Sequence, residues 1–355
     1  MPKVVAQQAI KPLAKYFLII HLFMYSYFTD KYNLKIIYSH QGYGNFIRLY
    51  RGIPVELFFM DKDIKSFDDF LPFADTIKSI NFLRCALDDL SALTEFKKLK
   101  ELYISDSIIH SKRFCQFLQL PSLKELTISN QNYPEENPYI HSLAEAHLPS
   151  LRSLAIGSFE TDSLKDVYLP SLRELVLPYS VNSLKGAYIP LLEKLDAEHL
   201  KEIDVALPKL KKLHIKLKGF DFYSLKNTPN LRELYAIHTY YDDQQTFDGL
   251  EVCKKLKYIE MLSCPFKNFL PFSKLKSLEH LDVSYGSEIE SLEGLEQLPN
   301  LKKLCLYDNE FIKEIDDISF IKNLKVLEIE KHKVLKIIDE IEKRDIALWI
   351  IPDES

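Results

Sequence analysis

Short apolar segments recur along most of this chain with the same internal spacing. From residue 77 onward, an apolar residue is followed by apolar residues three and five positions later, so each segment reads L-x-x-L-x-L with conservative replacements. Clear examples begin at Leu123, Leu172 and Leu301. This alternation is typical of a strand, because successive side chains of a strand point to opposite faces. The fourth and sixth positions are therefore predicted core residues, whereas the third and fifth positions point away from the core.

The segment is repeated many times, at intervals of 18 to 28 residues. A self-similar period of this length indicates stacked repeats, whose strands form a parallel sheet at a spacing of about 4.8 Å. No single repeat would be stable alone. The twelve repeats begin at Ile77, Leu99, Leu123, Leu151, Leu172, Leu192, Leu210, Leu231, Leu256, Leu278, Leu301 and Leu324. Prolines stand two residues before seven of these positions, where the missing N–H ends the preceding segment.

The length of a repeat predicts what connects its strand to the next. Repeats between residues 151 and 230 run 18 to 21 residues, which is too short for a helix, so extended connections are expected there. The flanking repeats run 21 to 28 residues, and segments such as residues 111–120 can supply a helical turn.

The L-x-x-L-x-L segments resemble those of the leucine-rich-repeat superfamily. The resemblance implies an α/β solenoid, with a curved parallel β-sheet on the concave face and short helical or extended segments on the convex face. The superfamily places Asn or Cys three residues after the sixth position, where the side chain bonds the backbone of the turn. This chain has Cys85, Cys264 and Asn309 there, whereas most repeats depart from the pattern, among them the one with Ser107.

The repeats are expected to lie between two caps, an N-terminal cap at 1–76 and a C-terminal cap at 331–355, with the repeats at 77–330. Residues 13–28 are strongly apolar but shorter than the roughly 20 residues of a spanning helix. We expect a helix that covers the open end of the stack, with interfacial membrane contact as the alternative. The caps should further contain strands at 34–38, 46–50 and 55–59, an amphipathic helix after residue 333 and a closing strand around Trp349.

Composition and charge exclude several classes of protein. The net charge of −5 lacks the basic excess of a nucleic-acid-binding protein, and only 9 glycines leave little room for phosphate-binding loops. The 5 cysteines are scattered without a CxxC pair, so we expect reduced thiols and neither disulfides nor a zinc site. The chain carries no cleavable signal pattern, which predicts a cytoplasmic protein or one secreted into a host cell without such a signal.

No motif with recognised chemistry is present, since GxGxxG, P-loop, HExxH and GxSxG patterns are missing. We therefore expect no enzyme, no catalytic residue, no cofactor and no metal, but a monomeric scaffold that binds a protein partner. The Lys- and Ile-rich, glycine-poor composition also resembles the leucine-rich-repeat effectors of intracellular bacterial pathogens. That resemblance implies a role in virulence and a host protein as partner, whereas an endogenous cytoplasmic scaffold is the alternative.

The candidate binding surface is the outward face of the later strands, where aromatic and acidic residues occupy the third and fifth positions. Tyrosine is a favoured interface anchor because it buries apolar area and still offers a hydroxyl group. Such a face suits a basic or mixed-charge protein surface, although tyrosines that merely stack on each other would give the same pattern. The candidate partner-binding residues are Glu233, Tyr235, Tyr240, Tyr241, Tyr258, Glu260, His280, Asp282, Tyr285 and Tyr307.

Overall fold

The structure is a computed structural model, and the residues it describes fall in two compact units. The N-terminal unit comprises Met1–Glu160 with Val167–Leu169, and the C-terminal unit comprises Thr161–Asp166 with Pro170–Ser355. The expected helix at 13–28 lies outside the described residues, as do Tyr240, Tyr241 and Cys264. The described residues are 35–37, 45–51, 53–111, 113–129, 143–157, 164–178, 180–197, 199–217, 219–237, 247–263, 266–285 and 288–351.

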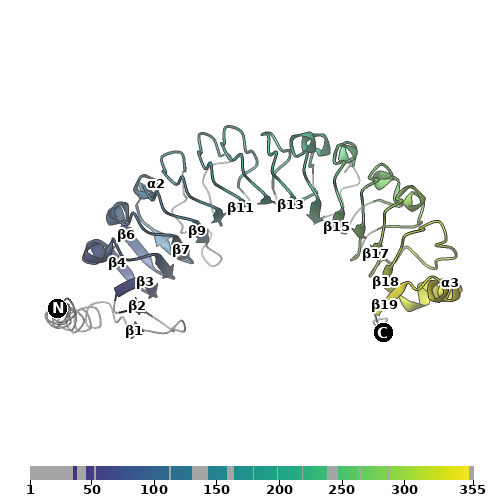
Figure 1. The fold of residues 1–355 in the computed structure, drawn as a ribbon, viewed down its shortest axis with the longest axis horizontal. Helices are drawn as coiled ribbons and strands as arrows, with labels where there is room; N and C mark the ends of the chain where they lie inside the picture. Colours follow the sequence, from purple (N-terminus) through teal and green to yellow (C-terminus); the bar gives the residue numbers. More distant parts are fainter. Residues whose placement is uncertain are drawn as a thin grey trace, which may run out of the picture. The chain divides into compact units, whose positions relative to one another are not determined.

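The N-terminal unit is built on a sheet in which strands follow one another in chain order (Figure 1). Only β2 and β3 pair antiparallel, while the other described pairs in this unit are parallel. The strands are β1 (Lys35–Ile37), β2 (Phe46–Tyr50), β3 (Ile53–Met60), β5 (Ser79–Leu83), β7 (Glu101–Ser105), β9 (Glu125–Ser129) and β10 (Ser153–Ile156). A second, smaller parallel sheet contains β4 (Asp63–Ser66), β6 (Ala86–Asp89) and β8 (Ile108–Ile109). The helical turns are η1 (Asp68–Phe73), η2 (Ser91–Glu95) and α2 (Phe114–Phe117).

The C-terminal unit repeats the same arrangement with parallel strands throughout its described pairs. Its strands are β11 (Glu174–Val176), β12 (Lys194–Asp196), β13 (Lys212–Lys216), β14 (Glu233–Ile237), β15 (Tyr258–Leu262), β16 (His280–Asp282), β17 (Lys303–Cys305), β18 (Val326–Glu330) and β19 (Ala347–Ile351). Its helical segments are η3 (Phe222–Asn227), η4 (Leu250–Val252), η5 (Leu270–Phe272), η6 (Leu295–Gln297), η7 (Lys331–Ile337) and α3 (Ile338–Lys343). In each unit the strands of the long sheet lie along one side and the connecting segments along the other (Figure 1).

The core lies between these two sides and contains every predicted fourth and sixth position. In the C-terminal unit, for example, Leu213 pairs in register with Leu234, and Leu234 with Ile259. The predicted register is therefore confirmed, and burial of each such side chain contributes about 1.5 to 3 kcal/mol. The buried positions are Ile80, Phe82, Leu102, Ile104, Leu126, Ile128, Leu154, Ile156, Leu175, Leu177, Leu195, Ala197, Leu213, Ile215, Leu234, Ala236, Ile259, Met261, Leu281, Val283, Leu304, Leu306, Leu327 and Ile329.

One connection differs from the expectation for the short repeats. The segment η3 lies in the repeat that begins at Leu210, where an extended connection was expected. The 3-10 helix rises about 2.0 Å per residue and closes a turn in three residues, so it fits where an α-helix does not. The side chain of Asp221 caps it by accepting a hydrogen bond from the backbone N–H of Tyr223 at 2.9 Å.

The residues that hydrogen-bond the backbone of the turns include more types than the Asn and Cys of the family pattern. Cys85 is buried at its expected place, and its backbone N–H donates to the hydroxyl oxygen of Ser107 at 2.9 Å. That hydroxyl donates in turn to the carbonyl of Ser105 at 2.8 Å. Ser107, which departs from the Asn or Cys pattern, therefore bonds the backbone of the turn as those residues would.

The expected cap strands are present, and they continue the sheets of the repeats. Strand β3 pairs parallel with β5, so that Leu57 stacks on Ile80. At the other end η7 and α3 lead into β19, in which Leu348 pairs with Leu327 of β18. Within the described part of the chain, no helix has the length and apolar character needed to cross a bilayer.

Candidate functional site

The candidate site is the surface of the C-terminal sheet that carries the third and fifth positions, here called the strand face. It contains Glu233 and Tyr235 on β14, Tyr258 and Glu260 on β15, and His280 and Asp282 on β16. Parallel pairing places Tyr258 between Glu233 and His280, and Glu260 between Tyr235 and Asp282. The structure thus brings six of the ten predicted residues together on three adjacent strands.

Aromatic rings form a continuous row across this face. The ring centres of Tyr235 and Tyr258 lie 5.0 Å apart, and those of Tyr258 and His280 lie 4.4 Å apart. The row extends to β13, where the ring of His214 lies edge-on to Tyr235 at 6.3 Å and Lys212 Nζ lies 4.1 Å from the centre of the Tyr235 ring. These tilted and edge-on ring contacts fix each ring against its neighbours and reduce the side-chain freedom that binding would otherwise remove.

His214 and Lys212 were missed by the sequence analysis, which began the binding surface at the repeat of Leu231. The signal was present, because both residues occupy the fifth and third positions of the preceding repeat. Reading the outward positions one repeat earlier would have included them.

Acidic side chains accept hydrogen bonds from the tyrosine hydroxyl groups of the row. The hydroxyl of Tyr258 donates to Glu260 Oε2 at 2.7 Å, and that of Tyr235 donates to Glu233 Oε2 at 3.3 Å. Burial, and then the bond to Glu260, raise the pKa of Tyr258 above its ordinary value. The hydroxyl therefore remains protonated at neutral pH, and the face presents oriented carboxylates beside apolar rings.

Tyr285 and Tyr307 form a separate pair beyond the ends of β16 and β17. Their rings meet edge to face at 5.3 Å, and the backbone N–H of Tyr285 donates to the carbonyl of Tyr307 at 2.8 Å. Tyr285 is 50% exposed and has a positive φ of 60°. The pair adds a second aromatic feature to the same unit.

A hollow of about 290 Å³ adjoins the row on strands β11 to β14. Its wall includes a contact of 3.1 Å between His214 Nδ1 and Asp196 Oδ2. Its lining residues are Glu174, Leu175, Val176, Lys194, Leu195, Asp196, Lys212, His214 and Tyr235. The hollow gives the strand face a recess into which a protruding side chain of a partner would fit.

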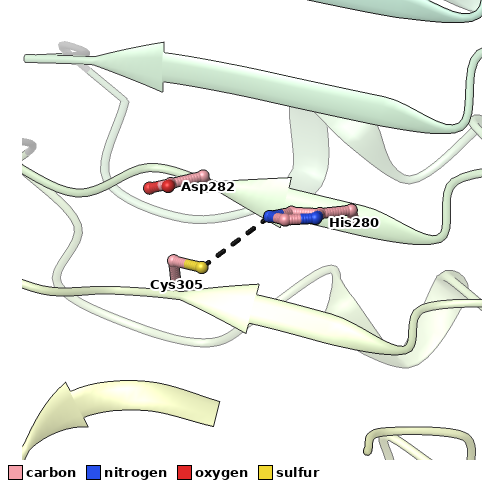
Figure 2. Close-up of side chains that lie close together, drawn as sticks. All are labelled: His280, Asp282 and Cys305. Carbon is pink, nitrogen blue, oxygen red and sulfur yellow. Dashed lines mark hydrogen bonds between the residues drawn. The ribbon is translucent and has the colours of Figure 1, made fainter. Parts of the chain in front are cut away.

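On the other side of the row, potential metal ligands meet on β16 and β17. The side chains of His280, Asp282 and Cys305 converge there, with all their ligand atoms within 4.8 Å of one another (Figure 2). The sequence analysis had placed the first two in the binding surface and had expected no metal ligand.

Parallel strands stacked in register on L-x-x-L-x-L segments are the arrangement of a leucine-rich-repeat protein, and the chain has this fold. The family model that matches it describes Zer-1-like leucine-rich repeats and covers residues 270–339. A curated relative, the disease resistance protein RPP4 of Arabidopsis thaliana, is 30% identical over 231 residues. The match covers 61% of this chain and 17% of the relative, so the chain spans about a sixth of that protein.

One solved structure shows the same fold at low sequence identity. An internalin (inlF) from Listeria monocytogenes superposes with a TM-score of 0.57 at 18% identity, covering 84% of this chain and 87% of the internalin. A leucine-rich-repeat protein of Leptospira interrogans gives a TM-score of 0.37 at 18% identity, covering 83% and 89% of the two chains.

Proposed function

We propose that this protein is a non-catalytic scaffold that binds a protein partner through the strand face of its C-terminal unit. The observation that carries the proposal is the row of rings from His214 through Tyr235 and Tyr258 to His280, held in place by their contacts with one another. Leucine-rich repeats commonly mediate protein–protein interaction, and interface anchors are enriched in tyrosine.

The charges around the row favour a basic or mixed-charge partner. Glu233, Glu260 and Asp282 flank the rings, while Lys212 is the cation that lies over Tyr235. Carboxylates next to an aromatic surface suit lysine and arginine side chains, which can place an apolar stem on a ring and a charge beside an acid. The neighbouring hollow would take a larger anchor of the same partner.

The double variant Tyr235→Ala with Tyr258→Ala tests the proposal. The full-length protein and the variant are used in parallel to capture proteins from cell lysates, and binding of the proteins enriched by the wild type is then measured with purified components. We expect affinity to fall by about 2 kcal/mol or more, which is about 30-fold. The matched control is Tyr188→Ala with Tyr223→Ala, which removes two tyrosines that are 51% and 53% exposed outside the strand face.

The control should bind as the wild type does. If the Tyr235 and Tyr258 double variant binds with the same affinity as the wild type, the partner binds to another surface and the proposal is wrong. If the rings only stack to stabilise the sheet, the double variant would lose thermal stability while a correctly folded fraction kept full affinity.

We further propose that the protein acts in a reducing compartment, either as a cytoplasmic scaffold or as an effector inside a host cell. The thiols of Cys85, Cys253 and Cys305 are buried and take part in no disulfide bond with the described residues, which supports this proposal. Comparing capture from host-type eukaryotic lysates with capture from bacterial lysates separates the two settings. If the protein selectively captures a bacterial protein, and this capture depends on Tyr235, the result would contradict the proposal that it acts as an effector inside a host cell.

The alternative function, membrane docking by residues 13–28 with the repeats selecting a target, rests on the apolar run of the sequence. Sedimentation of the full chain with liposomes, compared with an Ile19→Asp and Ile20→Asp variant, distinguishes it. Co-sedimentation that is lost in the variant would favour docking, and no sedimentation of either protein would eliminate it.

A further inference from the structure

The fifth positions of the last repeats form an unusual column across the strand face. Parallel register pairs Asp282 of β16 with Cys305 of β17, and Cys305 with Glu328 of β18. The column continues to Glu260, which pairs with Asp282 on the other side. Acidic groups directly opposite each other across strands are destabilising unless a cation lies between them.

His280 stands at the third position of the repeat that begins at Leu278, and it adds a nitrogen ligand to this column. Figure 2 shows the His280 ring reaching from β16 toward Cys305 on the next strand. The distance from His280 Nε2 to Cys305 Sγ is 3.8 Å, and the thiol donates a hydrogen bond to Glu328 Oε2 at 3.0 Å. The His280 ring lies tilted against the Tyr258 ring, with the ring centres 4.4 Å apart, and this contact holds it in this orientation.

The distances between these side-chain atoms are close to the distances between ligand atoms around a bound metal ion. With bonds of about 2.05 Å to nitrogen and about 2.3 Å to sulfur, a tetrahedral zinc ion separates the two ligand atoms by about 3.6 Å. The separation of 3.8 Å between His280 and Cys305 needs almost no adjustment. The ligand atoms of Asp282 and the other two residues lie within 4.8 Å of one another, so a small rotation of the carboxylate completes three ligands.

We propose that His280, Asp282 and Cys305 bind a divalent transition-metal ion of the zinc class, with Glu328 as the fourth ligand. The combination of sulfur, nitrogen and oxygen ligands selects zinc-like ions over magnesium or calcium, which prefer oxygen alone. On binding, the Cys305 thiol loses its proton to solvent, the thiolate forms the bond to the metal, and Glu328 Oε2 exchanges its hydrogen bond for a metal bond. The ion joins three neighbouring strands at the edge of the aromatic row.

The surrounding charges are compatible with this role. Lys303 Nζ pairs with Glu328 Oε1 at 2.7 Å, which leaves Oε2 directed at Cys305. Burial and the nearby Lys303 lower the pKa of His280, which favours the neutral ring that a metal ligand requires. Burial and the bond to Glu328 raise the pKa of Cys305, and a metal ion supplies the positive charge that a thiolate needs there.

Sequence spacing alone predicted no metal site, because the ligands come from separate repeats. His280 and Cys305 are 25 positions apart, and Cys305 and Glu328 are 23 apart, so no short ligand motif is formed. The proposal does not depend on the proposed binding function, and either can fail without the other.

Titration of the full-length, reduced and chelator-treated protein with cobalt chloride tests the site. Tetrahedral Co²⁺ bound to a thiolate gives intense visible absorption and a sulfur-to-cobalt charge-transfer band. We expect both to saturate at one equivalent and to disappear on addition of zinc chloride. Cys305→Ser should abolish the charge-transfer band, and His280→Ala should weaken Co²⁺ binding by more than about 100-fold, since outer-shell changes alone cost about 10- to 100-fold.

Two matched variants serve as controls, because each removes a comparable side chain outside the cluster. Cys253→Ser removes a buried thiol, and His214→Ala removes a histidine of the same strand face that pairs with an aspartate. Both should keep the full spectrum. Absence of a saturable band in the wild type would overturn the proposal whatever the variants do, as would a band that survives Cys305→Ser or that is lost in Cys264→Ser instead.

Discussion

Removing one core leucine from the middle of the C-terminal unit measures how far the repeats depend on their neighbours. Leu213 is fully buried and pairs in register with Leu195 on one side and Leu234 on the other. Leu213→Ala deletes the equivalent of about three methylene groups, worth about 2.4 kcal/mol by transfer alone. The cavity between two fixed neighbours adds to this, and we expect a total loss of about 3 to 5 kcal/mol in the free energy of unfolding.

The same substitution at an exposed leucine is the control. Leu335 is 57% exposed in the same unit, so Leu335→Ala should cost less than about 1 kcal/mol. Urea unfolding followed by circular dichroism gives both values. Hydrogen exchange of the peptides around β12, β13 and β14 shows whether the loss is shared, because neighbouring repeats are coupled through their interfaces.

A cost for Leu213→Ala no larger than that for the control would refute the argument. A slip of one residue in strand register moves every side chain to the opposite face, so an inexpensive substitution would mean that Leu213 points outward. The third and fifth positions would then form the core, and the binding face described above would not exist.

Three further predictions test separate parts of the C-terminal unit. Gly249→Ala should destabilise by about 2 kcal/mol or more in urea unfolding, because φ is 96° and an added Cβ would lie 2.4 Å from a backbone nitrogen. Gly219→Ala, with φ of 70° and open space, should cost only about 1 kcal/mol, and equal costs would contradict the packing. Burial raises the pKa of Cys253 to about 12, so about 1 thiol in 10⁴ is ionised at pH 8, and mass spectrometry should find its alkylation at least about 100-fold slower in the native than in the denatured protein. Hydrogen bonds from Lys257 and Lys302 lower the pKa of Glu279 from 4.5 to about 2. The ionised carboxylate therefore stabilises the fold above pH 4.5, and this stabilisation is lost as the pH falls toward 2. The urea midpoint of Glu279→Gln should therefore change less with pH across that window, and an unchanged profile would contradict the pairing.

Most of the core could be predicted from the sequence because the alternation of side chains along a strand is a local property. The repeat at Leu210 fixes Leu213 and Ile215 as inward residues without any knowledge of their neighbours, and both are fully buried. The same reasoning predicted the strand at 55–59, which the structure shows as Ile53–Met60, but not its parallel pairing with β5, since pairing depends on which segments stack.

The candidate site was less accessible because its contacts join different repeats. The pattern places Tyr235 and Tyr258 on one face, but whether the rings touch depends on side-chain rotamers and on the neighbouring strand. The approach of His280 to Cys305 depends on the same geometry. Ser107 shows the converse, because a hydroxyl of suitable reach satisfied a backbone group for which the family pattern uses another residue type.

The alternation described for every strand separates the residues that determine stability from those that determine recognition. In β14, Leu234 and Ala236 face the core, while Glu233 and Tyr235 face outward. Substitutions at the outward positions leave the stack intact, so the surface can change one strand at a time during evolution or in engineering. A library that varies only these positions across adjacent strands would therefore yield folded proteins with new binding preferences, and the hydrophobic repeat would persist in descendants whose partners differ.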